Sequence, residues 1–424
     1  MKTVRVIGAG LAGCEACYQL LKRNYFVELY EVKYLKKNPI QHNDLFANLA
    51  YSDSFRSNLL TDSVGTLKQE MRLLDSLVIK AAEFSSTEDT NNSLVLNRIK
   101  FQEYITNFLQ SQKNLKIIKQ EYVEIDLNIP TIIATGPITT TNLENSIRDL
   151  VGEENFYLFD AVEPMVWKES INMNLMYQEN DDLYCLLNKQ QFENIYKQII
   201  DAEIFISPLN NEIQMVEDYG LKSLESIAKD KELLLKTIFK PIKNSYASVR
   251  LKKDSVKDNI YNIVGFQTSI KWPFQKNIIK SIPGLENAEI LRYGVMHKND
   301  YINSKKLFNV GFQLKNHPNI FFAGQITGVD GYVESTASAI ISSINLDRYL
   351  NNKKIIIPSV DSTIGALCNY LHKTTDQIFQ PIKINWAIVG KNTKMPTSLI
   401  DKQKLSNKAI KSIEKYISKI NKNC

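Results

Sequence analysis

Long apolar runs are missing from this 424-residue chain, and cysteine is scarce. The longest apolar stretch falls well short of the ~20 residues that a membrane-spanning helix needs, so we expect neither such a helix nor a membrane partner. The chain leads from Met1 straight into a strand-like segment, Val4 to Gly8, so no signal peptide is expected. Five scattered cysteines make no disulfide framework and favour a reducing, cytoplasmic location.

Charge of one sign is not in large excess either. The chain has 52 Lys and Arg against 46 Asp and Glu, a formal charge of +6. Apolar residues make up 44% and charged residues 23%, which excludes a disordered or collagen-like chain. At roughly 150 residues per domain, the length predicts two or three domains.

Seven lysines fall between Lys402 and Lys422. A basic face of this kind attracts nucleic acid, but it is also an ordinary solvated helix face in a chain that favours Lys, Asn and Ile throughout. Four isoleucines recur on one helical face, which predicts that the segment packs on the body of the protein: Ile410, Ile413, Ile417 and Ile420.

Residues 3–31 give the clearest local signal. A short apolar strand runs into a GxGxxG turn, a helix follows, and a second strand ends at Glu31. Gly8 permits the tight turn, Gly10 lets the backbone approach a pyrophosphate, and Gly13 lets the helix lie close to the strand. The helix N-terminus presents N–H groups to the phosphates, and Glu31 can accept hydrogen bonds from ribose hydroxyls. The segment predicts a dinucleotide-binding βαβ unit.

Two later segments repeat the pattern of an apolar strand that ends in a glycine turn. One runs from Thr131 to Pro137 and contains Gly136; the other begins near Ile320 and contains Gly324 and Gln325. Such turns are typical of flavoproteins with two dinucleotide-binding folds. The alternative is that both are simply buried strands. Together with residues 8–31, they predict one bound FAD.

A second GxGxxG does not occur among the 16 glycines, so no separate nicotinamide-binding fold is visible. The fold predicted is α/β, with a two-dinucleotide-binding-type, Rossmann-like FAD domain and an inserted α/β domain. We expect the FAD domain at residues 1–155 and 291–350, the inserted substrate domain at 156–290, and a C-terminal helical region at 351–424.

Longer motifs carry a family resemblance. They include residues 65–72, 152–155, 261–268, 282–289, 292–297 and 322–335. In these motifs the chain resembles the folate- and FAD-dependent tRNA uracil-5-methyltransferases, the TrmFO type. The resemblance implies bound FAD, methylenetetrahydrofolate as the one-carbon source, and NAD(P)H as a redox partner. The lack of a nicotinamide-binding fold favours oxygen as the alternative redox partner, which would reoxidise the flavin.

The expected site residues follow from the turns and from the resemblance. Cofactor-binding residues are Gly8, Ala9, Gly10, Leu11, Ala12, Gly13, Glu31, Arg56, Gly136, Gly324, Gln325, Gly328, Gly331 and Tyr332. Tyr51 and His297 are the expected catalytic residues, and no metal site is expected. His42 also falls in a family-like segment, with a structural role at least as plausible.

Both catalytic cysteines of the family are expected to be absent. The family's Cys-Ser-Asn-Ser-Leu-Arg is matched here by Tyr51 to Arg56, and its Phe-x-x-Cys-Leu-Pro-x-Glu by Phe205 to Glu212, which puts Pro208 at the cysteine. Proline has no nucleophile, and an ordinary tyrosine is about 0.1% phenolate at neutral pH. Cys185 is the only plausible substitute. Cys14 and Cys17 have a redox-like spacing but occupy a core helix.

Three functions remain open. The loss of both thiols favours an FAD-dependent oxidoreductase that oxidises methylenetetrahydrofolate to methenyltetrahydrofolate, since flavin chemistry needs no cysteine. The alternative is a methylenetetrahydrofolate- and FAD-dependent uracil-5-methyltransferase of tRNA or rRNA with a rearranged nucleophile. The third is a non-catalytic flavoprotein that binds RNA or protein through its basic end. Folate is thus the expected small-molecule partner, and RNA a doubtful one.

Overall fold

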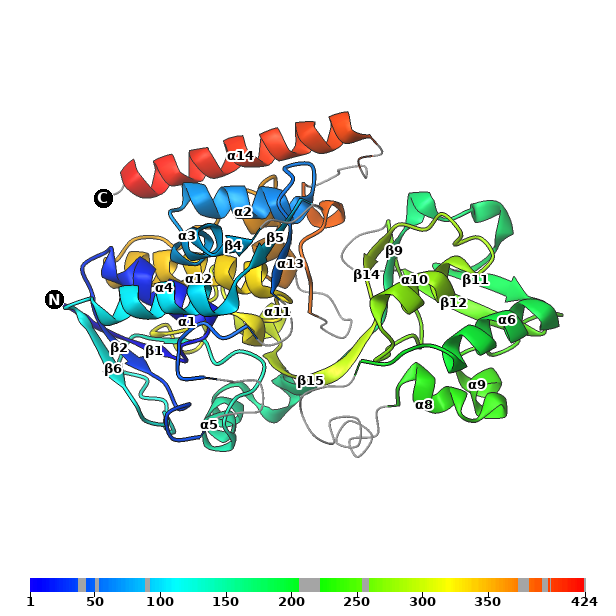
Figure 1. Ribbon diagram of the computed structural model, residues 1–424, viewed down its shortest axis with the longest axis horizontal. Coiled ribbons are helices and arrows are strands. Elements are labelled where there is room, and N and C mark those ends of the chain that lie inside the picture. The colour runs from blue at the N-terminus through cyan, green and yellow to red at the C-terminus, as the bar shows by residue number, and fades with distance from the viewer. Residues whose placement is uncertain are drawn as a thin grey trace. The chain divides into compact units, whose positions relative to one another are not determined.

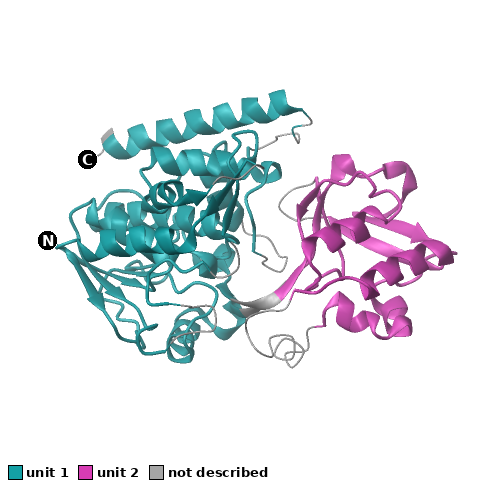
Figure 2. Cartoon of the chain, in the orientation of Figure 1, with its two compact units in different colours: residues 1–158, 299–374, 381–424 teal, residues 159–298, 375–380 magenta. Residues whose placement is uncertain are grey.

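The computed structural model of the chain describes residues 1–36, 43–49, 53–87, 92–205, 222–253, 259–372, 381–390, 396 and 398–422. Side chains at 158–161, 297–299 and 422 are not among those described. The chain divides into two compact units (Figure 2). Unit 1 holds residues 1–158, 299–374 and 381–424, and unit 2 holds residues 159–298 and 375–380.

Unit 1 is built on a parallel sheet of five strands in the order β16-β7-β1-β2-β6. Because helices cover such sheets, their strands are apolar and buried; β7 and β16 are buried throughout, and β1 is buried at Val4, Val6 and Ile7. The strands are β1 (Thr3–Ile7), β2 (Phe26–Tyr30), β6 (Leu115–Ile118), β7 (Thr131–Ile133) and β16 (Ile320–Phe322). The predicted Rossmann-like α/β fold is confirmed.

Two helices lie side by side over this sheet (Figure 1). They are α1 (Leu11–Leu21) and α12 (Tyr332–Leu350), which contact each other as well as the strands. Fifteen of the 19 residues of α12 are buried, and many are Ser, Ala or Thr, which lets the helix sit inside the unit. Other helices are α2 (Ser63–Leu73), α3 (Leu77–Phe84), α4 (Arg98–Gln110), α5 (Thr141–Val151), α11 (Ser304–Leu307), α13 (Thr363–His372) and α14 (Leu399–Lys422).

A small antiparallel sheet, in the order β3-β5-β4, completes unit 1. Its strands are β3 (Ser54–Ser57), β4 (Ser86–Thr87) and β5 (Ser93–Leu96). A buried carboxylate then ties two helices together: Glu70 of α2 accepts hydrogen bonds from the Thr363 and Ile364 N–H groups at 2.7 and 2.9 Å, at the start of α13. These N–H groups would otherwise lack partners within their helix.

Unit 2 is an antiparallel sheet of six strands, β10-β11-β12-β13-β9-β14, packed against helices. Its strands are β9 (Met165–Trp167), β10 (Met176–Glu179), β11 (Asp182–Leu187), β12 (Ala247–Lys253), β13 (Ile260–Ile263) and β14 (Ile290–Arg292). Its helices are α6 (Lys189–Ile200), α8 (Leu224–Ala228), α9 (Lys231–Thr237) and α10 (Trp272–Lys280). Strands β8 (Phe156–Val162) and β15 (Val295–Ile302) pair with each other and carry the chain between the units.

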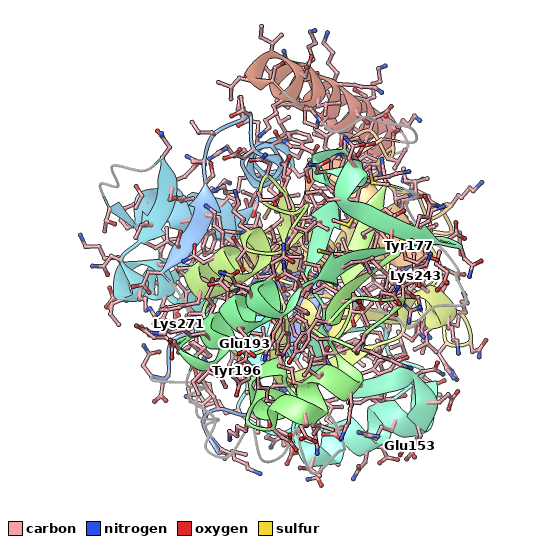
Figure 3. The ribbon with its side chains drawn as sticks, turned by 90° about the vertical axis from the view of Figure 1, so that its right-hand side faces the viewer. Glu153, Tyr177, Glu193, Tyr196, Lys243 and Lys271 are labelled. Atoms are coloured by element: carbon pink, nitrogen blue, oxygen red, sulfur yellow. The ribbon has the colours of Figure 1, made fainter. Side chains whose placement is uncertain are left out.

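The surface of unit 2 combines aromatic rings with lysines (Figure 3). The Lys243 ammonium lies 3.9 Å from the centre of the Tyr177 ring, and Lys231 lies 4.8 Å from that of Tyr196. Lys231 also pairs with Glu193, on the same helix as Tyr196. Cation–π and ion-pair contacts at such exposed sites add little to stability.

Candidate functional site: a dinucleotide-binding edge

The three predicted glycine turns lie on three adjacent strands. Ile7 at the end of β1 is paired with Ile133 of β7, and Ile133 is paired with Phe322 of β16. Since the strands are parallel, the turns that follow them meet at one edge of the sheet. The strand order changes direction at β1, because β2 and β6 lie on one side of it and β7 and β16 on the other. Open α/β sheets bind ligands at such a point.

The first turn, between β1 and α1, needs its glycines for different reasons. Gly8 has φ +99°, a region that favours glycine, and its N–H donates to the Tyr30 carbonyl at 2.9 Å. A Cβ on Gly13 would lie 1.8 Å from the Gly8 carbonyl oxygen, so only glycine lets the helix approach the turn. A Cβ on Gly10 would meet nothing within 4 Å.

The open space at Gly10 fits a pyrophosphate. Gly10 caps α1 with no side-chain hydrogen bond, and the first N–H within the helix to reach a carbonyl is that of Cys14. The N–H groups of Leu11, Ala12 and Gly13 therefore have no carbonyl partner within the helix and point along its positive end. A bare glycine in front of such N–H groups is the arrangement that dinucleotides use. The residues at the start of α1 therefore fit a bound pyrophosphate.

Glu31 lies beside this turn. Its carboxylate is buried and accepts hydrogen bonds from the Ala9 N–H at 2.7 Å and the Lys33 N–H at 2.8 Å. Each oxygen keeps a further lone pair for a ribose hydroxyl. The negative charge at this point disfavours a 2′-phosphate.

The turn after β16 closes against the same helix. A Cβ on Gly324 would lie 2.8 Å from the Ala12 Cβ, and the Gly324 N–H donates to the Ser338 hydroxyl of α12 at 2.8 Å. Gln325 begins a short 3-10 helix, and Gly328 and Gly331 after it have φ +84° and +116°. Gly136, after β7, also has positive φ, +72°. Together with the turn at Gly8 to Gly13, these glycines make three turns at the same edge of the sheet.

Arg56 is joined to the start of α12. Its Nη2 lies 2.5 Å from both carboxylate oxygens of Glu334, whose side chain is fully buried and also accepts the Ile384 N–H at 3.0 Å. A Cβ on Gly331 would lie 2.6 Å from that carboxylate. The Tyr332 ring lies 5.7 Å from the Phe55 ring. Two expected cofactor residues, Arg56 and Gly331, thus lie around one buried acid that the sequence analysis missed.

Lys68 is a second residue that lies in the motifs but is not among the expected site residues. Its side chain is fully buried, and Nζ donates to the carbonyls of Phe55 and Arg56 at 3.0 Å each. Burial, with the nearby Arg56 and Arg72 charges, lowers the pKa of Lys68 to about 7. Arg56 has φ +60°, so the lysine fixes a backbone segment in an unusual conformation. The sequence signal that could have identified Lys68 is a lysine on the buried face of a helix.

The described thiols are all core residues. Cys14, Cys17, Cys185 and Cys368 are buried, and burial raises the pKa of each, to about 12 for Cys14, Cys185 and Cys368. Cys185 sits in β11 within the core of unit 2 and donates to the Pro283 carbonyl at 2.9 Å. A thiol in this state is not a nucleophile. The structure therefore argues against Cys185 as a substitute for the family's cysteines.

The structure does not test the expected catalytic residues. Tyr51, His42 and Pro208 lie outside the described residues. His297 lies in strand β15, and its side chain is not among those described. Within the described ranges there is no group of three or more His, Cys, Asp or Glu residues arranged to hold a metal ion. Within the same ranges, no helix has both the length and the apolar character of a membrane span.

A parallel sheet with three glycine turns at one edge defines a dinucleotide-binding protein. The family model described as glucose inhibited division protein A matches residues 3–354. A methylenetetrahydrofolate--tRNA-(uracil-5-)-methyltransferase TrmFO 2 of Mycoplasma capricolum is 58% identical, over 99% of this chain and 100% of the relative. A TrmFO of Acetivibrio thermocellus is 38% identical over 98% of this chain and 99% of the relative. The chain therefore belongs to the TrmFO family.

Solved structures agree with the fold. GidA of Aquifex aeolicus has a TM-score of 0.53 and 15% identity, and the match covers 99% of this chain and 73% of that protein. At this identity the likeness shows the fold alone.

The expectation of a methylenetetrahydrofolate oxidoreductase is wrong. Relatives at 38% to 58% identity over nearly the whole chain are named as methyltransferases. That expectation inferred a changed reaction from two positions, Tyr51 and Pro208, and both lie outside the described residues. Full-length similarity to named methyltransferases outweighs it.

Proposed function

We propose that the chain is an FAD-containing, methylenetetrahydrofolate-dependent RNA uracil-5-methyltransferase that acts on tRNA or rRNA. The observation that carries the proposal is the 58% identity to a named methyltransferase over the full length of both chains. The glycine turns support it, because they leave a dinucleotide site at the edge of the parallel sheet. We also propose a cytoplasmic location, because an RNA substrate and a reduced folate are found there.

FAD would be held by residues from all three turns. The α1 N-terminus behind Gly10 would bind the pyrophosphate, and Glu31 the ribose. The turns at Gly136 and Gly324 and the start of α12 would line the flavin end. Bound FAD supplies the two electrons that convert a transferred methylene into a methyl group.

The atoms balance only with such a reductant. Methylenetetrahydrofolate gives a CH₂ unit to C5 of uracil, which loses its hydrogen, and tetrahydrofolate leaves. The product methyl group and tetrahydrofolate together contain two more hydrogens than the reactants, and reduced flavin is their source. NAD(P)H is the proposed reductant that restores the flavin.

We propose that Tyr51 and Pro208 occupy the positions of the family's two cysteines, and that Tyr51 and His297 line the catalytic site. Tyr51 would stack on a ring or close the uracil pocket. The thiols of unit 1 and unit 2 that the structure describes are buried and protonated, so activation of uracil C6 does not come from them.

The decisive experiment uses the purified holoprotein with methylenetetrahydrofolate, NAD(P)H and unmodified tRNA or rRNA transcripts. The expected product is 5-methyluridine, measured by mass spectrometry of digested nucleosides. A holoprotein that turns over NAD(P)H but forms no 5-methyluridine on either RNA overturns the proposal. Tyr51→Phe tests the phenol: retained methylation is expected for a stacking ring, and its loss would assign chemistry to the hydroxyl.

A further inference from the structure

Helix α14 presents a line of lysines that the dinucleotide site does not use. Lysines occupy positions i, i+4, i+7, i+11, i+15 and i+18, which at 3.6 residues per turn fall within an arc of about 80°. This lysine ridge consists of Lys404, Lys408, Lys411, Lys415, Lys419 and Lys422. Its five members with described side chains are exposed. At 1.5 Å per residue the ridge extends over about 27 Å.

The opposite face of α14 anchors the helix. Ser406, Ala409, Ile413 and Tyr416 are buried, and the helix packs along α2 (Figure 1). The Thr66 hydroxyl of α2 donates to the Ser406 hydroxyl at 2.8 Å. The expectation that this segment packs on the body is confirmed, and the ridge is a fixed surface of unit 1.

Charge is concentrated on this helix. Seven lysines against Asp401 and Glu414 give α14 a formal charge of +5, out of +6 for the whole chain. Lys404 lies 3.5 Å from Asp401, and Lys408 lies 2.9 Å from Asp361. Within the described part of the chain, no carboxylate lies in ion-pair distance of Lys411 or Lys415. Like charges at i, i+4 destabilise a helix, so the ridge opposes folding.

A general preference for lysine does not explain the pattern. The adjoining exposed flank of α14 carries Asn407, Glu414, Ser418 and Asn421, and no lysine. Compositional bias would scatter lysines over the whole exposed surface of the helix. Only Lys402 lies away from the ridge, so the other six follow one line.

We propose that the lysine ridge binds the phosphate backbone of the RNA substrate. The inference rests on the proposed function, which supplies a polyanion as substrate. A fixed row of ammonium groups suits a row of phosphates, because each contact releases condensed counterions. A bilayer is the poorer occupant, since a helix that binds membranes inserts its apolar face, and α14 buries that face against α2.

The test compares two variants of the FAD-loaded full chain with equal charge change. The first carries Lys404→Gln, Lys408→Gln, Lys411→Gln and Lys415→Gln. The control carries Lys100→Gln, Lys113→Gln, Lys116→Gln and Lys354→Gln, four exposed lysines of unit 1 outside α14. Binding of a fluorescent, unmodified tRNA transcript is measured by anisotropy across a salt series, and circular dichroism verifies folding.

The ridge variant is expected to lose affinity on the order of 10²-fold at 100 mM salt. Its slope of log K against log salt should fall by about 3, because each phosphate contact contributes roughly 0.7–0.9. The control should stay within a few-fold of the wild type. At saturating RNA the kcat for methylation should match the wild type while KM for RNA rises.

Equal losses in the two variants overturn the inference. So does ridge-dependent binding to phosphatidylserine vesicles without ridge-dependent binding to RNA. A wild type that binds RNA through the ridge but forms no 5-methyluridine refutes the proposed function and leaves the ridge as an RNA-binding surface. A wild type that methylates RNA with unchanged KM in the ridge variant refutes the ridge alone.

Discussion

Arg56 holds Glu334 through a single nitrogen that lies 2.5 Å from both carboxylate oxygens. The pair joins β3 to the first turn of α12, and the Ile384 N–H adds a third segment. The Glu334 side chain is fully buried, whereas that of Arg56 is 32% exposed. This acid therefore ties together segments around the proposed flavin end.

Glu334→Gln should lower the free energy of unfolding by about 2 kcal/mol. A buried pair that loses one charge costs roughly 3–5 kcal/mol, and the partial exposure of Arg56 reduces the loss. Urea denaturation measures it. The matched control is Glu232→Gln, which breaks an exposed pair with Lys236 and should change stability by less than ~0.5 kcal/mol. Equal effects of the two substitutions would contradict the role of Glu334 as a buried, stabilising partner of Arg56.

Gly10→Ala and Gly13→Ala should have opposite signatures. An added Cβ at Gly10 meets no protein atom within 4 Å, so stability of the FAD-free protein should be unchanged while FAD affinity falls about 10-fold, ~1.4 kcal/mol. At Gly13 the Cβ strikes the Gly8 carbonyl, which should cost at least ~3 kcal/mol of stability. FAD titration and thermal unfolding separate the two. Unchanged FAD affinity in Gly10→Ala would show that the pyrophosphate does not bind at this helix end.

Lys68 predicts a pH dependence of stability. Its pKa is about 7 when folded and near 10.5 when unfolded, so between these values only the unfolded chain holds the proton. The free energy of unfolding should therefore rise with pH across this window, by at most about 5 kcal/mol, and below pH 7 the full cost of burying the charge remains. The difference between wild type and Lys68→Met, measured in urea from pH 6 to 10, isolates this contribution. A constant difference would show that Lys68 titrates normally.

Cys185→Ala should retain RNA methylation. With a pKa of about 12, the thiol is ~10⁻⁵ ionised at pH 7, and it lies in a core strand. The substitution should cost about 1–2 kcal/mol of stability from lost packing. Mass spectrometry of 5-methyluridine gives the answer. Abolished methylation in a folded Cys185→Ala protein would make this thiol the nucleophile after all.

Much of the FAD-domain fold was predictable, because its signals are local. The GxGxxG turn depends on nearby residues alone. The local sequence likewise predicts a helix over 99–112 and a strand over 115–118, and the structure has α4 at Arg98–Gln110 and β6 at Leu115–Ile118. The helix-like sequence of residues 64–82 predicts one helix, but the structure has two, α2 and α3. Asp75 has φ +60°, and the Ser76 side chain caps α3, so the chain breaks there. The strand-like sequence of residues 122–125 predicts a short strand, which does not form.

The polar core of the site was not predictable in the same way. Glu334 binds Arg56, which lies 278 residues before it in the chain, and Lys68 binds the Phe55 and Arg56 carbonyls on a separate element, 13 and 12 residues before it. Periodicity shows which face of a helix is buried, but not which carbonyl or guanidinium meets it there. The predicted oxidoreductase reaction was wrong for a related reason, since the identities of Tyr51 and Pro208 do not show which groups surround them.

The fixed orientation of the Glu31 carboxylate affects the entropy cost of binding an adenosine ribose. Two backbone N–H groups already orient it, so docking a sugar freezes no further rotation of that side chain. If Glu31 binds the sugar as proposed, the entropy of ordering its side chain is lost during folding and not on binding. Shortening this side chain by one methylene, as in Glu31→Asp, would then separate the sugar contact from the Ala9 N–H of the glycine turn.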